Sequence, residues 1–223
     1  MQEDGFAGRS VLVLGAAGAL GAGVAAAFAA AGALVTAVDK AEPEENRRLA
    51  DVRYEAVDVL DNDAVGALFD SGPAPWAVIN TVGGFAANRP LSELDLAELT
   101  SQIELNLVTA ALITKHAMRV MQSAGRIVHT ASRAGVVSKG SGFAYSVSKL
   151  GVLHLVSMAA DEVRGSSITV NCVVPSIIDT PANRAAMPAA NHDAWPKIPD
   201  IAGTYLYLAR PTSSLVNGAA IPV

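Results

Sequence analysis

The sequence contains a single cysteine, Cys172, among its 223 residues. One cysteine cannot form an internal disulfide, and its place in the apolar run ITVNCVVP favours a small buried side chain over a nucleophile. A chain without disulfides suits a reducing compartment, so we predict a cytoplasmic location.

Basic residues are few and scattered. The chain has 16 Lys and Arg against 21 Asp and Glu, a formal net charge of −5. With no basic stripe to follow a phosphate backbone, we expect no nucleic-acid partner. The length suits one α/β domain with a substantial core, so we predict a single domain over residues 1–223.

Charge is absent altogether from Val11 to Val38, a run long enough to span a bilayer. Its pattern changes along the way, however: SVLVLG is strand-like, LGAGVAAAFAAAG is Ala-rich at helical length, and ALVTAVD is strand-like again. Arg9 is the one basic residue before it, which does not suit a signal peptide. We therefore predict a β-α-β unit here and no membrane partner.

The same alternation of strand-like and helical segments continues to residue 223. We predict strands at 53–58, 76–82, 126–132, 168–174 and 219–223, and long helices at 20–31, 95–122 (broken near Thr100) and 142–164. Alternating strands and helices imply parallel pairing through right-handed crossovers. The predicted fold class is therefore α/β, a doubly wound parallel sheet flanked by helices.

One stretch is irregular, DTPANRAAMPAANHDAWPKIPD at about 179–200, with four prolines dispersed through it. A segment of this length in a compact domain is more often a functional lid than a plain loop. We predict a substrate lid there.

Three glycines, Gly15, Gly18 and Gly21, lie between the first predicted strand and the first helix, in LGAAGALG. Glycines at such a turn bring backbone N–H groups and the helix N-terminus up to a pyrophosphate. The same spacing also serves close packing of a helix on a strand, and the turn alone does not decide between the two.

Carboxylates end the second and third predicted strands. Asp39 can accept hydrogen bonds from both hydroxyls of an adenosine ribose, or it can cap the next turn. Asp58 can accept from an adenine amino group or cap the following helix, although Asp61 is better placed as that cap.

Tyr145 and Lys149 are four positions apart in GFAYSVSKLGVLHL, so a helix would put them on one face. An ammonium about 5 Å from a phenol would lower the phenol's pKa by about two units and make it an acid/base group. The alternative is an amphipathic helix whose tyrosine packs and whose lysine reaches solvent.

Taken in order, these segments resemble the short-chain dehydrogenase/reductase family. The matching motifs are LGAAGALG, VD at 38–39, NTVG at 80–83, ELN ending at Asn106, HTAS ending at Ser132, YSVSK from Tyr145, and VPSIIDTP at 174–181. Ser132 stands thirteen residues before Tyr145, as in that family. The resemblance implies a Rossmann-type sheet, NAD(P) chemistry and a catalytic tetrad of Asn106, Ser132, Tyr145 and Lys149.

The resemblance also implies which residues contact the dinucleotide. They are Gly15, Ala17, Gly18, Ala19, Leu20, Gly21, Asp39, Asp58, Val59, Asn80, Gly83, Tyr145, Lys149, Pro175, Ile178 and Thr180. By resemblance, Lys149 would hold the nicotinamide ribose, Ser132 would donate to the substrate oxygen, and Asn106 would anchor a water of the proton relay. In the alternative reading, Ser132 hydrogen-bonds a backbone group at the end of a strand, and Asn106 is a polar helix residue that faces solvent. We expect His129 to be a strand residue without a role.

Two segments, GAAGALG and DTPANRAAMP, look like the dihydropteridine reductase branch of the family. That branch lacks the catalytic serine and asparagine, which are present here as Ser132 and Asn106. Reduction of a quinonoid pterin by NADH is therefore an alternative to carbonyl/alcohol chemistry. A non-catalytic dinucleotide-binding module is a third reading, which the presence of Tyr145 and Lys149 disfavours.

The sequence further predicts a preference for NAD, with NADP possible, because the Asp39 carboxylate would repel a 2′-phosphate that Lys40 partly offsets. The expected partner is a small-molecule substrate, against an apolar wall of Phe85, Met187, His192 and Trp195, unless these only pack the lid closed. We expect no metal. Apolar residues on several faces of 95–122 and 142–164 suggest a homodimer or homotetramer, as is common in the family.

Overall fold

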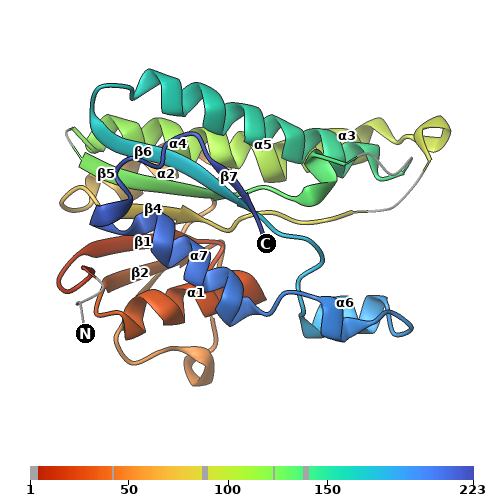
Figure 1. Ribbon diagram of the computed structural model, residues 1–223, viewed down its shortest axis with the longest axis horizontal. Helices are drawn as coiled ribbons and strands as arrows, with labels where there is room; N and C mark the ends of the chain where they lie inside the picture. Colours follow the sequence, from red (N-terminus) through yellow and green to blue (C-terminus); the bar gives the residue numbers. More distant parts are fainter. Residues whose placement is uncertain (1–4, 42, 87–89, 123, 138–140) are drawn as a thin grey trace.

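Seven parallel strands form the sheet at the centre of the molecule (Figure 1). The computed structural model describes residues 5–41, 43–86, 90–122, 124–137 and 141–223. The strands are β1 Ser10–Leu14, β2 Leu34–Asp39, β3 Val52–Ala56, β4 Ala77–Asn80, β5 Ala124–Thr130, β6 Ser167–Val174 and β7 Ala220–Pro222. Their order is β3-β2-β1-β4-β5-β6-β7, and every neighbouring pair is parallel. This confirms the predicted single-domain, doubly wound sheet.

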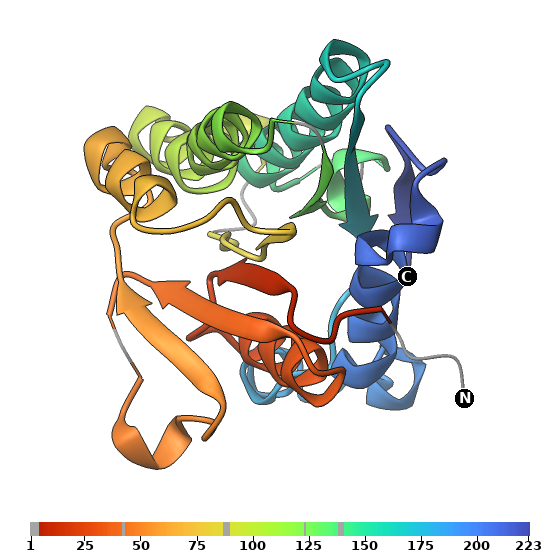
Figure 2. The ribbon, with the colours of Figure 1, turned by 90° about the vertical axis from the view of Figure 1, so that its left-hand side faces the viewer.

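Helices cover both faces of the sheet, as Figures 1 and 2 show. On one face lie α2 (Asn62–Asp70), α4 (Thr109–Val120) and α5 (Phe143–Glu162); on the other lie α1 (Ala19–Ala30) and α7 (Ile198–Ala209). A further helix, α3 (Leu96–Ile103), packs beside α5, and α6 (Pro181–Ala186) extends past the carboxyl ends of the strands.

Strand side chains alternate between two hydrophobic layers because successive residues of a strand point to opposite faces. Leu12 and Leu14 belong to the layer under α4 and α5, whereas Val11 and Val13 belong to the layer under α1 and α7. Cys172 is fully buried in the first layer, and burial raises the pKa of its thiol to about 12. Its predicted role as a small buried side chain is confirmed.

The uncharged run from Val11 to Val38 forms β1, α1 and β2, as predicted, and not one long helix. Among the described residues, one helix is long and apolar enough to cross a membrane by length and composition alone, the 20-residue α5. Its buried face packs against the sheet, while Leu150 and Met158 are exposed. The predicted homodimer or homotetramer stays a prediction.

The predicted helix over 95–122 is interrupted, but not near Thr100. A π-helical turn, Glu104–Val108, separates α3 from α4. The side-chain amide of Asn106 donates to the carbonyl of Gln102 at 3.1 Å, which is the acceptor that the backbone N–H of Asn106 would use in an α-helix. This competition accounts for the wider turn.

The lid segment is more regular than predicted. It contains α6 and a 3₁₀ turn at His192–Ala194, and its last three residues already belong to α7. The dispersed prolines suggested irregular structure, yet Pro181 and Pro199 both lie in the first turn of a helix, where proline is tolerated because that N–H has no helical acceptor.

Candidate active site

The predicted site residues converge on one edge of the sheet, because parallel strands present their carboxyl ends to the same side. Gly15 follows β1, Asp39 ends β2, Asn80 ends β4, Ser132 follows β5 and Pro175 follows β6. The strand order reverses between β1 and β4, so the site lies at the switch point where open α/β sheets bind ligands.

Packing requires glycine at two of the three glycine positions in the glycine-rich turn. A Cβ on Gly15, whose φ is +85°, would lie 2.7 Å from the backbone nitrogen of Val82, and a Cβ on Gly21 would lie 2.1 Å from the carbonyl oxygen of Gly15. A Cβ on Gly18 would meet only that same carbonyl, at 3.3 Å. Gly18 precedes α1, and no side chain caps this helix. The first N–H groups of α1, including those of Ala19 and Leu20, are therefore suited to an anion.

Asp39 holds the glycine-rich turn in place. Its carboxylate accepts from the backbone N–H of Ala17 at 2.9 Å and of Lys40 at 2.8 Å. The side chain of Lys40 forms an ion pair with Asp58 at 2.9 Å, and this hydrogen bond, with one from the backbone of Leu60, lowers the pKa of Asp58. Lys40 is thus paired next to Asp39, the residue predicted to accept from an adenosine ribose.

Asp58 is not the cap of the following helix. Asp61 caps α2 by accepting from the backbone N–H groups of Asp63 and Ala64 at 2.9 and 3.1 Å, as predicted. Val59, between these carboxylates, is partly buried against the core under α4 and α5.

Tyr145 and Lys149 lie one turn apart on α5, and the lysine points inward. Its ammonium is 5.9 Å from the centre of the Tyr145 ring and donates to the carbonyl of Thr130 at 3.1 Å; the residue is 3% exposed. Lys149 therefore does not reach solvent, so the amphipathic-helix alternative for it is wrong. The side chain of Ser132 lies close enough to Tyr145 to lower the pKa of its phenol, and it accepts from the backbone N–H of Ala134 at 3.2 Å.

The pKa values of this pair differ from the prediction that Lys149 lowers that of Tyr145. Burial raises the pKa of Tyr145 above its ordinary value, and the hydrogen bond with Ser132 offsets part of the rise. Burial also lowers the pKa of Lys149 to about 8. Desolvation is the main cause of both shifts because both groups lie in the interior. Tyr145 is therefore a protonated phenol at neutral pH, the form in which it can donate a proton.

Asn106 is 1% exposed, so it does not face solvent. Its Oδ1 accepts from the backbone N–H of Gly84 at 3.1 Å, and its Nδ2 lies 3.1 Å from Oγ of Ser148. A Cβ added to Gly83 would lie 2.6 Å from Oδ1 of Asn106 and 2.7 Å from Nζ of Lys149. The backbone at Gly83 therefore lies directly against both predicted catalytic side chains, and the polar contacts of Ser148 were missed from the sequence.

A buried hydrogen-bond chain supports this turn from beneath. Oγ1 of Thr114 donates to the carbonyl of Ala110 at 2.7 Å, so it must accept from Nε2 of His129, 2.8 Å away. Nδ1 of His129 is then unprotonated and accepts from Nδ2 of Asn80 at 3.1 Å, while Oδ1 of Asn80 accepts from the backbone N–H of Val82 at 3.0 Å. His129, expected to have no role, thus fixes Asn80 and the turn before Gly83.

Two features made His129 detectable from the sequence: a histidine within a buried strand needs partners for both ring nitrogens, and an asparagine ends a neighbouring strand. Asn80 itself is 2% exposed with its side chain and carbonyl bonded within the protein. It supports the predicted cofactor site and presents no free polar side-chain atom to it.

The lid residues are held mainly by one another. Asp179 receives hydrogen bonds from Arg184 at 2.5 and 2.8 Å and from Lys197 at 2.6 Å, and these cations hold its pKa well below the usual range. Oγ1 of Thr180 caps α6 by accepting from the backbone N–H of Asn183 at 3.1 Å. The side chain of Ile178 is partly buried in the layer under α1 and α7.

Of the predicted substrate residues, Phe85 meets the predicted catalytic tyrosine. Its ring is 5.2 Å from that of Tyr145, edge to face, and the residue is 62% exposed. The rings of His192 and Trp195 contact each other at a tilt, with their centres 4.5 Å apart, and Nε2 of His192 is 2.8 Å from the carbonyl of Met187. These three lid residues contact one another, as expected for the alternative in which they only pack the lid closed.

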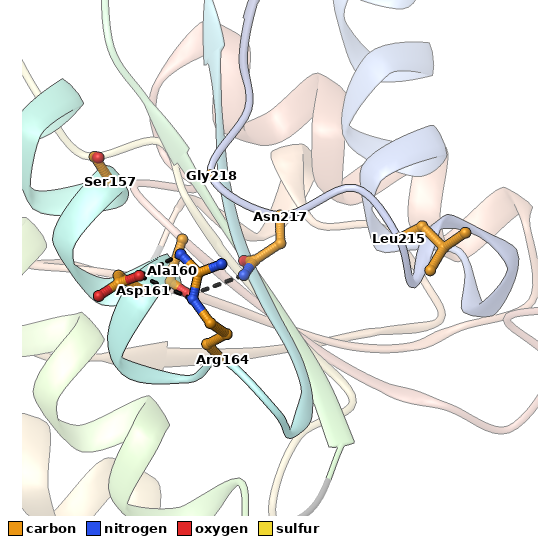
Figure 3. Close-up of a pocket in the computed structure, with 7 residues that line it drawn as sticks. All are labelled: Ser157, Ala160, Asp161, Arg164, Leu215, Asn217 and Gly218. Atoms are coloured by element: carbon orange, nitrogen blue, oxygen red, sulfur yellow. Dashed lines mark hydrogen bonds and ion pairs between the residues drawn. The ribbon is translucent and has the colours of Figure 1, made fainter.

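A separate open hollow lies at the far end of α5 (Figure 3). It is lined by Ser157, Ala160, Asp161, Arg164, Leu215, Asn217 and Gly218. Arg164 is nineteen positions after Tyr145 on or just past the same helix, roughly 28 Å along the axis at 1.5 Å per residue, so this hollow is no part of the candidate active site.

Comparison with known proteins identifies the class. Residues 15–223 match the family described as enoyl-(acyl carrier protein) reductase. A curated relative, cis-4-hydroxycyclohexanecarboxylate dehydrogenase of Sinomonas cyclohexanicum, is 35% identical over 99% of this chain and 96% of its own. The chain belongs to the short-chain dehydrogenase/reductase family of oxidoreductases.

Solved structures agree with this assignment. A short-chain type dehydrogenase/reductase from Mycobacterium ulcerans superposes with a TM-score of 0.89 at 27% identity, covering 98% of this chain and 89% of that one. A putative short-chain dehydrogenase from Escherichia coli CFT073, solved with NADPH, has a TM-score of 0.87 at 22% identity, covering 100% and 99% of the two chains, which supports the fold. The similarity of two segments to dihydropteridine reductases stays a prediction.

Proposed function

We propose that this protein is a nicotinamide-dependent oxidoreductase that interconverts a secondary alcohol and a ketone on a small substrate with an apolar body. One observation carries the proposal: Tyr145 lies beside Ser132 and one helical turn from Lys149, whose buried ammonium is 5.9 Å from the centre of the tyrosine ring. This arrangement provides a proton donor or acceptor at one atom, the phenol oxygen, with a second hydroxyl beside it.

The residues present fit a nicotinamide dinucleotide. The N-terminus of α1 lacks a side-chain cap, the Asp39 carboxylate ends β2, and the backbone at Gly83 leaves no room for a Cβ beside Lys149. The uncapped N-terminus suits a pyrophosphate, and Lys149 has donors left for ribose hydroxyls beyond its bond to Thr130. When bound, the nicotinamide supplies or accepts the hydride.

The chain's own residues then handle the proton. Ser132 donates a hydrogen bond to the substrate oxygen and holds it beside Tyr145. In reduction, the protonated phenol donates to that oxygen; in oxidation, it must first lose its proton, which the charged Lys149 favours. Asn106 acts by fixing Gly84 and Ser148 around Lys149. Phe85 offers an aromatic surface on which an apolar ring can pack next to Tyr145.

We further propose that NADH is preferred over NADPH, although a structural relative was solved with NADPH. Asp39 supports this preference because its negative charge would lie near a 2′-phosphate. Lys40 would offset little of that repulsion, because its ammonium is already paired with Asp58.

A direct assay tests the proposed function. Purified protein is incubated with NAD⁺ or NADP⁺ and a set of cyclic secondary alcohols, beginning with cis-4-hydroxycyclohexanecarboxylate and cyclohexanol, and formation of reduced cofactor is followed by its absorbance. We expect turnover with at least one ring alcohol. Binding of NADH without turnover of any alcohol or the matching ketones would contradict the proposal and favour a dinucleotide-binding module.

A further inference from the structure

Arg133 differs from the other cations that the structure describes. The side chains of Arg9, Lys40, Arg48, Arg53, Lys115, Arg119, Arg126, Lys149, Arg164, Arg184, Lys197 and Arg210 all have an interaction partner. Within the described part of the chain, the exposed side chain of Arg133 has no acidic, carbonyl or aromatic partner. Toward the described residues, its guanidinium therefore keeps its donors available for a ligand.

Its main chain is held firmly next to the catalytic groups. Arg133 directly follows Ser132, and its backbone N–H donates to the carbonyl of Pro175 at 3.1 Å. It begins the 3₁₀ turn Arg133–Gly135, which packs so closely on α5 that a Cβ on Gly135 would lie 2.8 Å from the backbone nitrogen of Leu150. The backbone of Arg133 is thus anchored between the predicted substrate-oxygen donor and the predicted nicotinamide side of the site.

Exposed apolar side chains lie near the predicted catalytic residues. Val136 and Val137 directly follow the turn of Arg133, Phe143 begins α5 two residues before Tyr145, and Phe85 meets the ring of Tyr145; these four side chains are between 41% and 63% exposed. No acidic residue occurs between Glu104 and Asp161, a stretch that contains Ser132, Tyr145 and Lys149, although the whole chain carries a net charge of −5. A catalytic segment that is positive in an acidic protein favours the approach of an anion.

We propose that Arg133 binds the carboxylate of the substrate, so that the protein acts on hydroxy or keto acids with an apolar body. This inference rests on the proposed function and narrows its substrate class. The planar guanidinium can donate two parallel hydrogen bonds to a carboxylate, while the exposed apolar side chains take the remainder of the molecule. The anion is bound at a distance from the reacting carbon, so Arg133 governs substrate affinity and takes no part in the proton transfer.

The test compares an acid with its neutral counterpart. A hydroxycyclohexanecarboxylate and its methyl ester share the ring and the alcohol but differ in charge, and cyclohexanol lacks the group altogether. We expect the wild type to prefer the acid. Arg133→Gln should raise KM for the acid about 10- to 100-fold, with kcat and all values for the ester little changed. Arg133→Lys keeps the positive charge but loses the planar group that donates two parallel hydrogen bonds. Its KM for the acid should therefore lie between those of the wild type and Arg133→Gln.

A matched control removes an arginine elsewhere. Arg164→Gln takes the same charge from the distant hollow of Figure 3, where Arg164 pairs with the exposed Asp161. It should leave the acid-to-ester ratio unchanged, so any general effect of net charge is visible. A readout without turnover is the rise in unfolding temperature on adding cyclohexanecarboxylate with NADH, expected for the wild type and Arg164→Gln but absent in Arg133→Gln.

The outcomes separate this inference from the proposed function. Two results would overturn the role of Arg133 while ring-alcohol oxidation still stands. One is a wild type with equal kcat/KM for the acid and the ester; the other is an Arg133→Gln variant whose kcat/KM falls equally for both substrates. Absence of turnover with acid, ester and cyclohexanol alike overturns the proposed function; if cyclohexanecarboxylate still stabilises the wild type and not Arg133→Gln, the anion site stands without it.

Discussion

Asn80 donates a hydrogen bond of 3.1 Å to Nδ1 of His129, joining two neighbouring strands beneath the candidate active site. The bond requires a neutral imidazole. Burial, with a smaller contribution from the charge of Lys149, lowers the pKa of His129 to about 4. Because the unfolded chain binds a proton near pH 6.5 and the folded chain does not, the stability contributed by His129 is complete above pH 6.5 and is lost as the pH falls towards 4.

We therefore predict that His129→Gln lacks part of the acid destabilisation of the wild type. The variant loses stability at pH 7.5, by about 1 to 3 kcal/mol, because a buried Asn80 amide loses its acceptor. Between pH 6.5 and 4.5, however, its free energy of unfolding should decline less steeply. Urea unfolding at several pH values measures both effects, and parallel pH profiles for the two proteins would refute the assignment.

Lys149 should reduce the stability of the fold that it serves. Because burial lowers its pKa from 10.5 to about 8, the ammonium form destabilises the folded state by on the order of 3 kcal/mol at pH 7. Lys149→Met, after losing the bond to Thr130, should still be about 2 kcal/mol more stable and inactive. Between pH 8 and 10.5 the wild type gains stability as its unfolded state alone stays protonated, so the gap should narrow. If the difference in stability between the variant and the wild type stayed constant from pH 8 to 10.5, Lys149 would be more exposed to solvent than the structure shows.

Gly83 is predicted to tolerate no side chain. In Gly83→Ala the new methyl group would lie 2.6 Å from Asn106 Oδ1 and 2.7 Å from Lys149 Nζ, so one of these must move. We expect kcat/KM to fall at least about tenfold, because displacement of catalytic groups by an ångström has effects of this size or larger. Gly72→Ala is the control, since a Cβ there meets nothing within 4 Å. Equal activity of the two variants would show that the Gly83 backbone does not position the site.

Cofactor preference should depend on the charge of Asp39. Asp39→Asn keeps an oxygen for the backbone N–H of Ala17 but removes the negative charge, whereas Asp39→Ala removes both. We expect the wild type to favour NADH, and Asp39→Asn to narrow the NADH/NADPH ratio of kcat/KM by about 10-fold or more. Asp39→Ala should also weaken both cofactors because the glycine-rich turn loses its anchor. A wild type that favours NADPH would remove Asp39 from the ribose site.

The sheet and the tyrosine–lysine pair were predictable because they depend on short periodicities. Alternating strand and helix lengths fix parallel pairing, and a spacing of four puts Tyr145 and Lys149 on one helix face. The π-helical turn was not. It arises where the side-chain amide of Asn106 bonds the carbonyl of Gln102, and that side chain is held in place by Gly84 and Ser148, which are remote in the sequence. The direction of the pKa shift of Tyr145 was also missed, because the degree to which Tyr145 and Lys149 are buried is set by the packing of the whole fold.

The central claim is that Tyr145 is the acid/base group of a nicotinamide-dependent oxidoreductase. Tyr145→Phe removes one oxygen and keeps the ring that meets Phe85 at 5.2 Å. The measurement is kcat for a ring alcohol beside Kd for NADH from fluorescence, in this variant and the wild type. The account predicts that kcat falls about 10²- to 10⁴-fold, as expected on losing a general acid/base, while Kd changes less than about threefold. A variant that keeps wild-type kcat, or one whose kcat is lost only in proportion to its NADH affinity, would contradict it.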